Sequence, residues 1–218
     1  MTHFTAQVSK DHYQAISYDT KDRWVSYWYQ ARAVMGYLSL HSGGPGQVLE
    51  IGPGNKTVGE ALKKQGITVT TADIAEDLNP DVVSSVTDLP FPDNSFDGVL
   101  AAEVLEHLPF DDVPLALAEI RRVARRFAVV SLPHAGYVFS CEFKVPLMRR
   151  REFIRKLPFF WKKHAFNGEH YWELGTRGYS VARIKKMMAD AGFAVRESQI
   201  HADDPSHCFF LLEKFAEK

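Results

Sequence analysis

Two acidic residues flank a glycine-rich turn in the first third of the chain. Glu50 stands just before the turn Gly52-Pro53-Gly54, and Asp73 closes the β-like run that follows. Glycines allow a sharp backbone turn and a close approach to a ligand. An acid at the tip of a second strand can accept hydrogen bonds from both hydroxyls of a ribose. These residues predict a binding site for a ligand that contains a ribose.

The charge of Glu50 indicates the class of this ligand. A carboxylate beside the glycine turn would repel a pyrophosphate, whereas it would attract a sulfonium or an ammonium group. The dinucleotide pattern G-x-G-x-x-G also lacks its third glycine, because Thr57 takes that place. The sequence therefore disfavours a nicotinamide-dependent oxidoreductase and favours a cationic nucleoside ligand.

The elements that would position these residues alternate between strand and helix. Val48 to Ile51 is a short apolar run typical of a buried strand, and residues 57–64 form an amphipathic segment that ends at Gly66 like a capped helix. A second helix is expected after Asp111, and a third runs from Ser180 to Ala191. Further strands are predicted at residues 67–71, 81–86, 96–102, 126–132, 193–200 and 208–215.

In this order, the motifs resemble those of the class I S-adenosylmethionine-dependent methyltransferases, in particular the small-molecule, methyltransferase type 11-like branch. Residues 50–54, EIGPG, look like motif I of that family, with Asp73 as the acid that follows it. Residues 86–97, VTDLPFPDNSFD, resemble the third-strand loop, and residues 101–108, AAEVLEHL, match the V-L-E-H-L stretch. The resemblance implies an α/β fold: a Rossmann-like, seven-stranded, mostly parallel sheet with helices on both faces and an antiparallel last strand.

The resemblance also implies S-adenosyl-L-methionine as the cofactor and gives its binding residues. Asp73 is expected on the ribose, the Asp88 carboxylate on the adenine amino group, and the Leu89 backbone N–H on a ring nitrogen. For Asp88, the alternative is a turn cap before Pro90. The full expected set is Glu50, Gly52, Pro53, Gly54, Asn55, Asp73, Ile74, Asp88, Leu89, Glu103 and Val104.

The length of 218 residues fits a single domain. Within it we expect an N-terminal helical cap at 1–46, the cofactor-binding core at 47–132, an inserted lid at 133–176, and a helix with a strand hairpin at 177–218. In the cap, residues 21–40 predict a helix whose Trp24, Tyr27 and Trp28 share a face that packs on the sheet. The alternative is that Tyr18, Tyr27 and Tyr29 cover the cofactor or the substrate.

The predicted lid occupies about forty residues where a plain sheet needs only a short connection. Seven basic residues lie between Arg149 and Lys163. An apolar stripe runs among them, formed by Phe153, Ile154, Leu157, Phe160 and Trp161. Such a segment can close over an active site, with Trp161 against the substrate, or it can contact an anionic membrane or polyanion through residues 149–163. We expect the lid because of its position after the fifth strand.

Histidines are the candidate catalytic bases, because their pKa lies near neutral pH. His107 follows the fourth strand, His134 ends the fifth, and His170 lies beside Glu169 near the end of the insertion. His107 has an equally good alternative role, which is to order Glu103. No metal site is expected, because no H-x-x-x-H or comparable spacing is present.

Composition narrows the function further. The net charge of -1 gives no indication of a nucleic-acid partner or of the oligomeric state, and the two cysteines are too few for a disulfide framework, which predicts a cytoplasmic protein. We expect methyl transfer to an oxygen, nitrogen or carbon atom of a small molecule. The alternatives are a methyltransferase that acts on RNA or protein through the basic lid, and a non-catalytic S-adenosylmethionine-binding or membrane-surface module.

Overall fold

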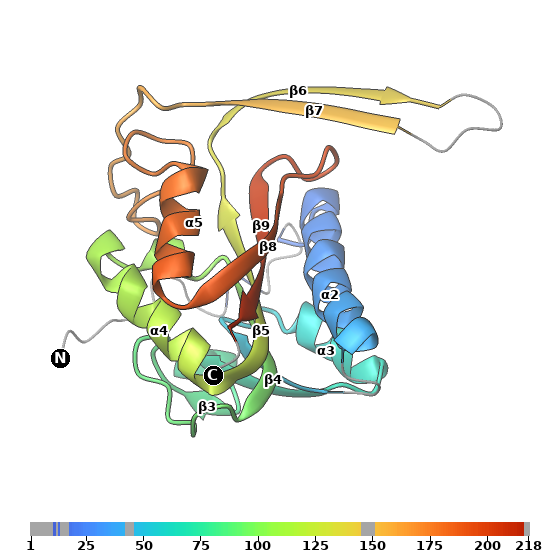
Figure 1. The fold of residues 1–218 in the computed structure, drawn as a ribbon, viewed down its shortest axis with the longest axis vertical. Coiled ribbons are helices and arrows are strands. Elements are labelled where there is room, and N and C mark those ends of the chain that lie inside the picture. The colour runs from blue at the N-terminus through green and yellow to red at the C-terminus, as the bar shows by residue number, and fades with distance from the viewer. Residues whose placement is uncertain (1–10, 12, 14–17, 42–45, 145–150, 216–218) are drawn as a thin grey trace.

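A seven-stranded sheet forms the centre of the computed structural model, which describes residues 11, 13, 18–41, 46–144 and 151–215 (Figure 1). The strand order is β3-β2-β1-β4-β5-β9-β8, and β9 is antiparallel to both of its neighbours. The predicted fold, mostly parallel with an antiparallel last strand, is confirmed. The strands are β1 (Gln47–Ile51), β2 (Thr68–Asp73), β3 (Val82–Val83), β4 (Phe96–Ala102), β5 (Ala124–Pro133), β8 (Phe193–Gln199) and β9 (His207–Lys214).

Helices cover both faces of this sheet. In Figure 1, α2 and α3 lie on one side of the sheet, and α4 and α5 lie on the other. The helices are α2 (Lys21–His41), α3 (Thr57–Lys64), α4 (Val113–Val123) and α5 (Val181–Asp190), with short 3-10 turns η1 (Glu76–Leu78), η2 (Leu105–His107) and η3 (Phe110–Asp112).

Alternate residues of the central strands fill two separate cores, because successive side chains on a strand point to opposite faces. Val48, Leu100 and Val129 pack with residues of α2 and α3. Leu49 and Val99 pack on the other face, with α4 and α5. This double coverage explains why these strands are apolar along nearly their whole length.

The strand order reverses between β1 and β4, which is where ligands bind in sheets of this type. In the register of these two parallel strands, Ile51 pairs with Ala101. The residues that follow them, Gly52 after β1 and Glu103 after β4, therefore emerge at the same edge of the sheet. The predicted glycine turn and the predicted E-H-L segment meet there.

The aromatic face predicted for the first helix is not the face that packs on the sheet. Trp24 and Trp28 are 55% and 54% exposed. The buried residues of α2 are Ser26, Gln30, Ala31, Val34, Tyr37 and Leu38. The prediction failed because the helix turns another face to the strands, the one that carries Ala31, Val34 and Tyr37, and Tyr37 stacks there on Phe127 of β5.

The insertion after β5 begins with an antiparallel hairpin formed by β6 (Gly136–Phe143) and β7 (Arg151–Pro158). Figure 1 shows that this hairpin extends beyond the body of the domain. The predicted apolar stripe is divided, because side chains in a strand alternate and Ile154 therefore faces away from Phe153 and Leu157. Residues 145–150, which hold the first two arginines of the basic run, lie outside the described residues.

Among the described helices, none is long and apolar enough to cross a bilayer.

Candidate active site

A cavity of about 260 Å³ lies at the edge where β1 and β4 end. It is bounded by the glycine turn, the start of α2, the segment after β4 and the loop after the β6–β7 hairpin. The predicted site residues that line it are Tyr18, Tyr27, Glu50, Gly52, Pro53, Asn55, Glu103, His107, Glu169 and His170. Those that do not line it are Tyr29, Gly54, Asp73, Ile74, Asp88, Leu89, Val104, His134 and Trp161.

Glu50 brings a buried carboxylate to this cavity. Its side chain is only 4% exposed, and its Oε2 atom has no hydrogen-bond partner among the described residues. Burial raises the pKa of Glu50 to about 7, while the Gly59 backbone N–H and two lysines of the α3 region lower it in part. An unpartnered buried carboxylate oxygen favours a cation as its neighbour.

Neighbouring side chains leave little room for a Cβ atom in the glycine turn. Gly52 has φ of 67°, and a Cβ there would lie 2.7 Å from the Val104 side chain. Gly54 has φ of 49°, and a Cβ there would lie 3.0 Å from the ring of Tyr13. The first glycine thus lets the turn after β1 pack closely against the segment after β4, which carries Glu103.

Asp73 and Asn55 organise the loops around the glycine turn. The Asp73 carboxylate accepts the Ala75 N–H at 2.8 Å, and burial raises its pKa. The Asn55 side chain donates to the Asp19 carboxylate at 2.8 Å and to the Tyr27 hydroxyl at 3.2 Å. Asn55 therefore fastens the segment before α2 to the glycine turn.

The third-strand loop contradicts one predicted contact. The Leu89 N–H donates to Glu119 Oε2 at 2.9 Å, and Leu89 is buried, so this donor is not available to an adenine ring. Arg122 fixes the same loop by donating to the Leu89 carbonyl at 2.8 Å. Asp88 is exposed, outside the cavity lining.

Sequence reasoning overlooked Ser84, whose buried hydroxyl has no partner among the described residues and whose N–H donates to the Asp73 carbonyl.

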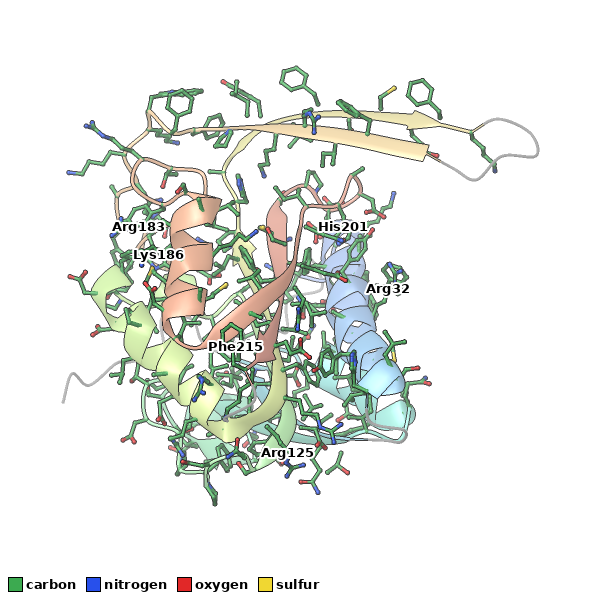
Figure 2. The ribbon with its side chains drawn as sticks, in the orientation of Figure 1. Arg32, Arg125, Arg183, Lys186, His201 and Phe215 are labelled. Atoms are coloured by element: carbon green, nitrogen blue, oxygen red, sulfur yellow. The ribbon has the colours of Figure 1, made fainter. Side chains whose placement is uncertain are left out.

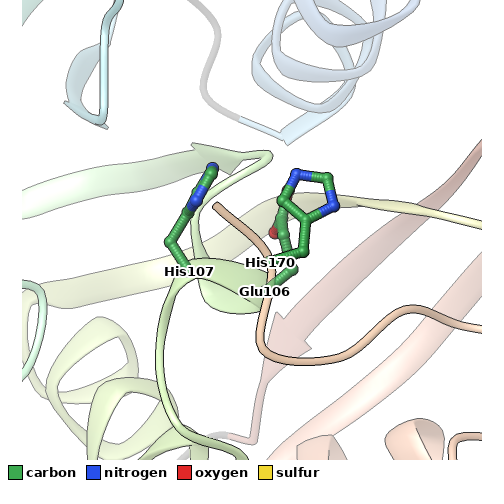
Figure 3. A group of neighbouring side chains, drawn as sticks. All are labelled: Glu106, His107 and His170. Carbon is green, nitrogen blue, oxygen red and sulfur yellow. The ribbon is translucent and has the colours of Figure 1, made fainter. Parts of the chain in front are cut away.

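On the opposite wall of the cavity, two imidazoles lie beside a buried carboxylate that does not itself line the cavity (Figure 3). The ring centroids of His107 and His170 lie 5.1 Å apart. His107 Nδ1 lies 3.0 Å from the Glu169 carbonyl oxygen, and His170 Nδ1 lies 3.1 Å from Glu173 Oε1. Burial lowers the pKa of His107, which keeps its imidazole neutral and able to accept a proton.

Glu106 is the carboxylate of this group, and it is fully buried. Neither of its carboxylate oxygens has a hydrogen-bond partner among the described residues. Burial, and then the nearby Glu103 carboxylate, raise the pKa of Glu106 well above its usual value.

Glu103 joins this wall to the start of β9. It has φ of 53°, a left-handed conformation that is uncommon outside glycine and that often occurs at functional sites. Its carboxylate accepts the Ser131 hydroxyl at 2.7 Å and lies 3.5 Å from His207 Nε2. His207 Nδ1 lies 2.7 Å from the buried Asp204 carboxylate. Burial alone would lower the pKa of His207, but the two carboxylates outweigh it and raise that pKa.

Arg23 also lines the cavity, and sequence reasoning gave it no role there. Its Nη1 donates to the Tyr18 hydroxyl at 2.7 Å, and the guanidinium carbon lies 3.7 Å from the centre of the Tyr18 ring. The signals that could have identified Arg23 and His207 were weak: an arginine in an aromatic helix start, and a histidine three residues after an aspartate. Neither belongs to a motif that can be recognised in one sequence.

Three of the predicted catalytic and substrate residues, Tyr29, His134 and Trp161, lie in other parts of the molecule. Tyr29 stacks on His201 with ring centroids 3.4 Å apart, in an open groove of about 670 Å³ between α2 and the β8–β9 pair (Figure 2). Tyr27 and Tyr29 differ in position because residues two apart on a helix do not share a face. His134 is buried beside Gly175, and its pKa is lowered to about 4 by burial and by Lys156. Trp161 is half exposed after β7 and packs on Phe160.

Comparison with known proteins agrees with this arrangement. Residues 49–131 match the family model described as a methyltransferase domain. No protein of curated function matches the chain in sequence.

Solved structures share the whole fold at low identity. The 1,6-didemethyltoxoflavin-N1-methyltransferase of Burkholderia thailandensis, with bound 1,6-didemethyltoxoflavin and S-adenosylhomocysteine, has a TM-score of 0.59 at 18% identity, over 95% of this chain and 87% of that one. The magnesium protoporphyrin IX methyltransferase of Synechocystis PCC 6803, with bound S-adenosylmethionine, has a TM-score of 0.59 at 16% identity, over 94% and 95% of the two chains. A putative methyltransferase of Haloferax volcanii, in complex with the Trm112 activator, has a TM-score of 0.59 at 14% identity, over 97% and 99%. This chain therefore matches a methyltransferase-domain model over residues 49–131 and shares its overall fold with these methyltransferases.

Proposed function

We propose that this protein transfers the methyl group of S-adenosylmethionine to a small-molecule acceptor. The observation that carries the proposal is the buried, unpartnered carboxylate oxygen of Glu50 on a cavity at the point where the strand order reverses. A sulfonium cofactor with an ammonium group supplies the positive charge that such an oxygen favours. The family match supports the same cofactor.

We call the side of the cavity formed by Glu50 and the glycine turn the cofactor wall. Its residues and their neighbours match the parts of S-adenosylmethionine as follows. Glu50 would oppose its positive charge, and Asp73, at the tip of β2, would accept the ribose hydroxyls. Arg23 is a cation on the cavity lining and would pair with the methionine carboxylate. Asp88 remains our proposal for the adenine amino group. When bound, S-adenosylmethionine supplies an activated methyl group on sulfur.

The opposite wall, which we call the acceptor wall, would bind and deprotonate the acceptor. His107, His170 and Glu169 line it, together with the phenol rings of Tyr18 and Tyr27. A neutral imidazole can accept the proton that the acceptor loses as it attacks the methyl group. The modest volume of the cavity, about 260 Å³, favours a small acceptor, as do two of the similar structures, whose names include 1,6-didemethyltoxoflavin and magnesium protoporphyrin IX.

Formation of S-adenosylhomocysteine tests this function. The protein would be incubated with S-adenosylmethionine and a panel of small hydroxyl, amine and carboxylate compounds, with product detected by mass spectrometry. We expect acceptor-dependent S-adenosylhomocysteine in the wild type and little in Asp73→Ala. If a folded wild type that binds the cofactor transfers methyl groups to RNA or to proteins instead, the small-molecule assignment is wrong.

A second proposal concerns the β6–β7 hairpin. Directly opposed residues of an antiparallel pair share a face. The pairs Tyr137–Leu157 and Phe139–Arg155 therefore place aromatic, aliphatic and cationic side chains together, and all four are exposed. We propose that this face contacts an anionic membrane surface, since basic residues and apolar side chains on one face favour binding at the interface.

Vesicle sedimentation tests the hairpin proposal. We expect the protein to sediment with phosphatidylserine-containing vesicles, and less with pure phosphatidylcholine. Phe139→Ser should reduce the bound fraction, whereas Val138→Ser, on the other face, should change it little. Equal binding to both vesicle types, or binding to RNA but not to either vesicle, would contradict the proposal.

A further inference from the structure

We propose that Glu106, His107 and His170 form a binding site for a divalent transition-metal cation, with Zn²⁺ as the simplest occupant, on the acceptor wall of the cavity. Each side chain offers one ligand atom, and these atoms all lie within 4.8 Å of one another. Figure 3 shows the three side chains together. Two imidazoles and one carboxylate are a common zinc ligand set that leaves a coordination position open.

The two imidazoles already have the relative placement that a shared metal requires. Their centroids are 5.1 Å apart, with the ring planes at 75°. With Zn–N bonds of about 2.0–2.1 Å and a tetrahedral angle, two rings on one zinc have centres roughly 5 Å apart. Binding would therefore draw the ligand atoms together without moving the rings far.

Each imidazole also has the outer contact that orients a metal-binding histidine. His107 Nδ1 faces the Glu169 carbonyl at 3.0 Å, and His170 Nδ1 faces the Glu173 carboxylate at 3.1 Å. Metal-binding histidines almost always donate their second ring nitrogen to a backbone carbonyl or a carboxylate in this way. These contacts fix the tautomer and make Nε2 the nitrogen that would bind the cation.

Glu106 supplies a second, independent observation. Its side chain has no exposed area, and both carboxylate oxygens lack a hydrogen-bond partner among the described residues. A buried carboxylate without a partner is costly, and buried charges in proteins are normally paired or bound to a metal. A divalent cation held by the two histidines would provide the missing partner.

The site escaped sequence reasoning because its ligands are not regularly spaced. Glu106 and His107 are adjacent in η2. His170 comes from the loop after the hairpin and follows Glu169, which lies 62 residues after His107 along the chain. The Tyr171 N–H donates to the Glu106 carbonyl at 2.9 Å, and this contact brings the loop to η2. Only the fold places the three side chains together.

The role of the cation rests on the proposed methyltransferase function, and in the metal-bound protein the cation replaces His107 and His170 as the group that promotes loss of the acceptor proton, because both imidazoles are then ligands. A cation at the open wall would bind an acceptor hydroxyl oxygen and lower its pKa. The O–H bond then breaks and its proton passes to water; the oxygen forms a bond to the methyl carbon, and the S–CH₃ bond breaks with its electron pair retained by sulfur. The site therefore predicts an acceptor that is methylated on oxygen.

Titration with Co²⁺, followed by displacement with Zn²⁺, tests the site without the cofactor or an acceptor. Tag-free, EDTA-treated protein should bind one equivalent of Co²⁺ with the visible absorption of a low-symmetry site. We expect binding to weaken more than 100-fold in His107→Ala, His170→Ala and Glu106→Gln, as is usual for loss of a ligand, and about 10–100-fold in Glu173→Gln. His41→Ala, which removes an exposed histidine at the end of α2, is the matched control and should bind normally.

Two results would overturn the proposal: no Co²⁺ or Zn²⁺ binding by the wild type, or equal affinity in wild type and His170→Ala. The buried Glu106→Gln variant can fail to fold. In that case His170→Ala decides the test, because His170 lies on a partly exposed loop. Thermal melts show which variants are folded. A separate titration with S-adenosylmethionine distinguishes the two proposals, because metal binding without cofactor binding would remove the methyltransferase function and leave the metal site.

Discussion

The two walls of the cavity are built in different ways. The cofactor wall comes from a short stretch of chain, with Glu50 and Gly52 at the end of β1. Asp73 ends the neighbouring strand β2 and lies outside the cavity lining. The acceptor wall joins distant segments: His107 after β4, His170 after the hairpin, and His207 at the start of β9. A sheet positions the first wall, whereas loop contacts position the second. We therefore expect the first to be rigid and generic and the second to hold the specificity of this protein.

The walls differ in charge as well as in construction. The cofactor wall has one buried carboxylate with an unpartnered oxygen, which suits a single positive charge. The acceptor wall combines Glu103 with three imidazoles, and the buried Glu106 lies beside two of them, which suits proton transfer or a metal ion. Variants that affect one wall and leave the other intact can test this division.

The largest effect is expected for Gly52→Ala. Its positive φ and the contact of 2.7 Å with Val104 combine strain with overpacking, so the free energy of unfolding should fall by about 4 kcal/mol and cofactor binding should be lost. Gly168→Ala is the matched control on the acceptor side, because φ is also positive there but no atom lies within 4 Å. Urea denaturation should show a smaller loss for Gly168→Ala, with cofactor binding retained. Equal losses would contradict the close packing of the two walls at Gly52.

The next effect concerns Glu50 and pH. Because burial raises its pKa from 4.5 to about 7, the folded state keeps a proton that the unfolded state releases, and the wild type should lose about 3 kcal/mol of stability as the pH rises from about 5 to about 8. Glu50→Gln removes this loss, so the free energy of unfolding of the variant, relative to wild type, should rise by that amount over the same pH range. Its cofactor affinity should nevertheless fall. Glu60, Lys56 and Lys63 also act on this carboxyl, so denaturation is measured at constant ionic strength.

If the stability difference between Glu50→Gln and wild type does not change with pH, the pKa of Glu50 is not raised in the folded protein. If cofactor affinity is unchanged in the variant, the carboxylate does not oppose the sulfonium or ammonium charge.

A smaller effect is expected for Arg23→Met, which keeps much of the side-chain length but removes the charge. Loss of a charged hydrogen-bond donor to the cofactor carboxylate should weaken binding about 10–100-fold. Arg32→Met is the control, since Arg32 also lies on α2 (labelled in Figure 2) but lines the other groove and not the cavity. Isothermal titration of both variants measures the difference, and an equal effect of the two substitutions would exclude a specific role for Arg23.

The smallest effect is expected from shortening the hairpin. Val138 and Lys156 are directly opposed, so an Asn-Gly turn can replace residues 139–155. Cofactor affinity should change less than about twofold, because none of the removed residues that the structure describes lines the cavity. A large loss of affinity would instead show that the hairpin acts as a lid over the cofactor.

The sequence was sufficient to predict the sheet and the position of the glycine turn, since both depend on local signals. Strand β4 and helix α3 lie at the predicted residues, because apolar runs and a terminal glycine indicate them directly. β3 is shorter than predicted, two residues where six were expected, because only Val82 and Val83 pair with β2.

The acceptor wall could not be predicted, because long-range packing determines it. The apolar and basic residues after β5 suit an amphipathic lid as well as a hairpin, and only strand pairing decides between the two. His134 and His170 are equivalent in the sequence, yet one is buried under Lys156 and the other lines the cavity. Leu89 illustrates the same limit, since its N–H is taken by Glu119, thirty residues further along the chain.

Calorimetric titration with S-adenosylmethionine and S-adenosylhomocysteine tests the central claim most directly, with wild type and Asp73→Ala measured side by side. The account predicts micromolar binding by the wild type, roughly -8 kcal/mol, and its loss in the variant. A folded wild type, free of retained ligand, that binds neither compound would contradict the assignment of this cavity to the cofactor.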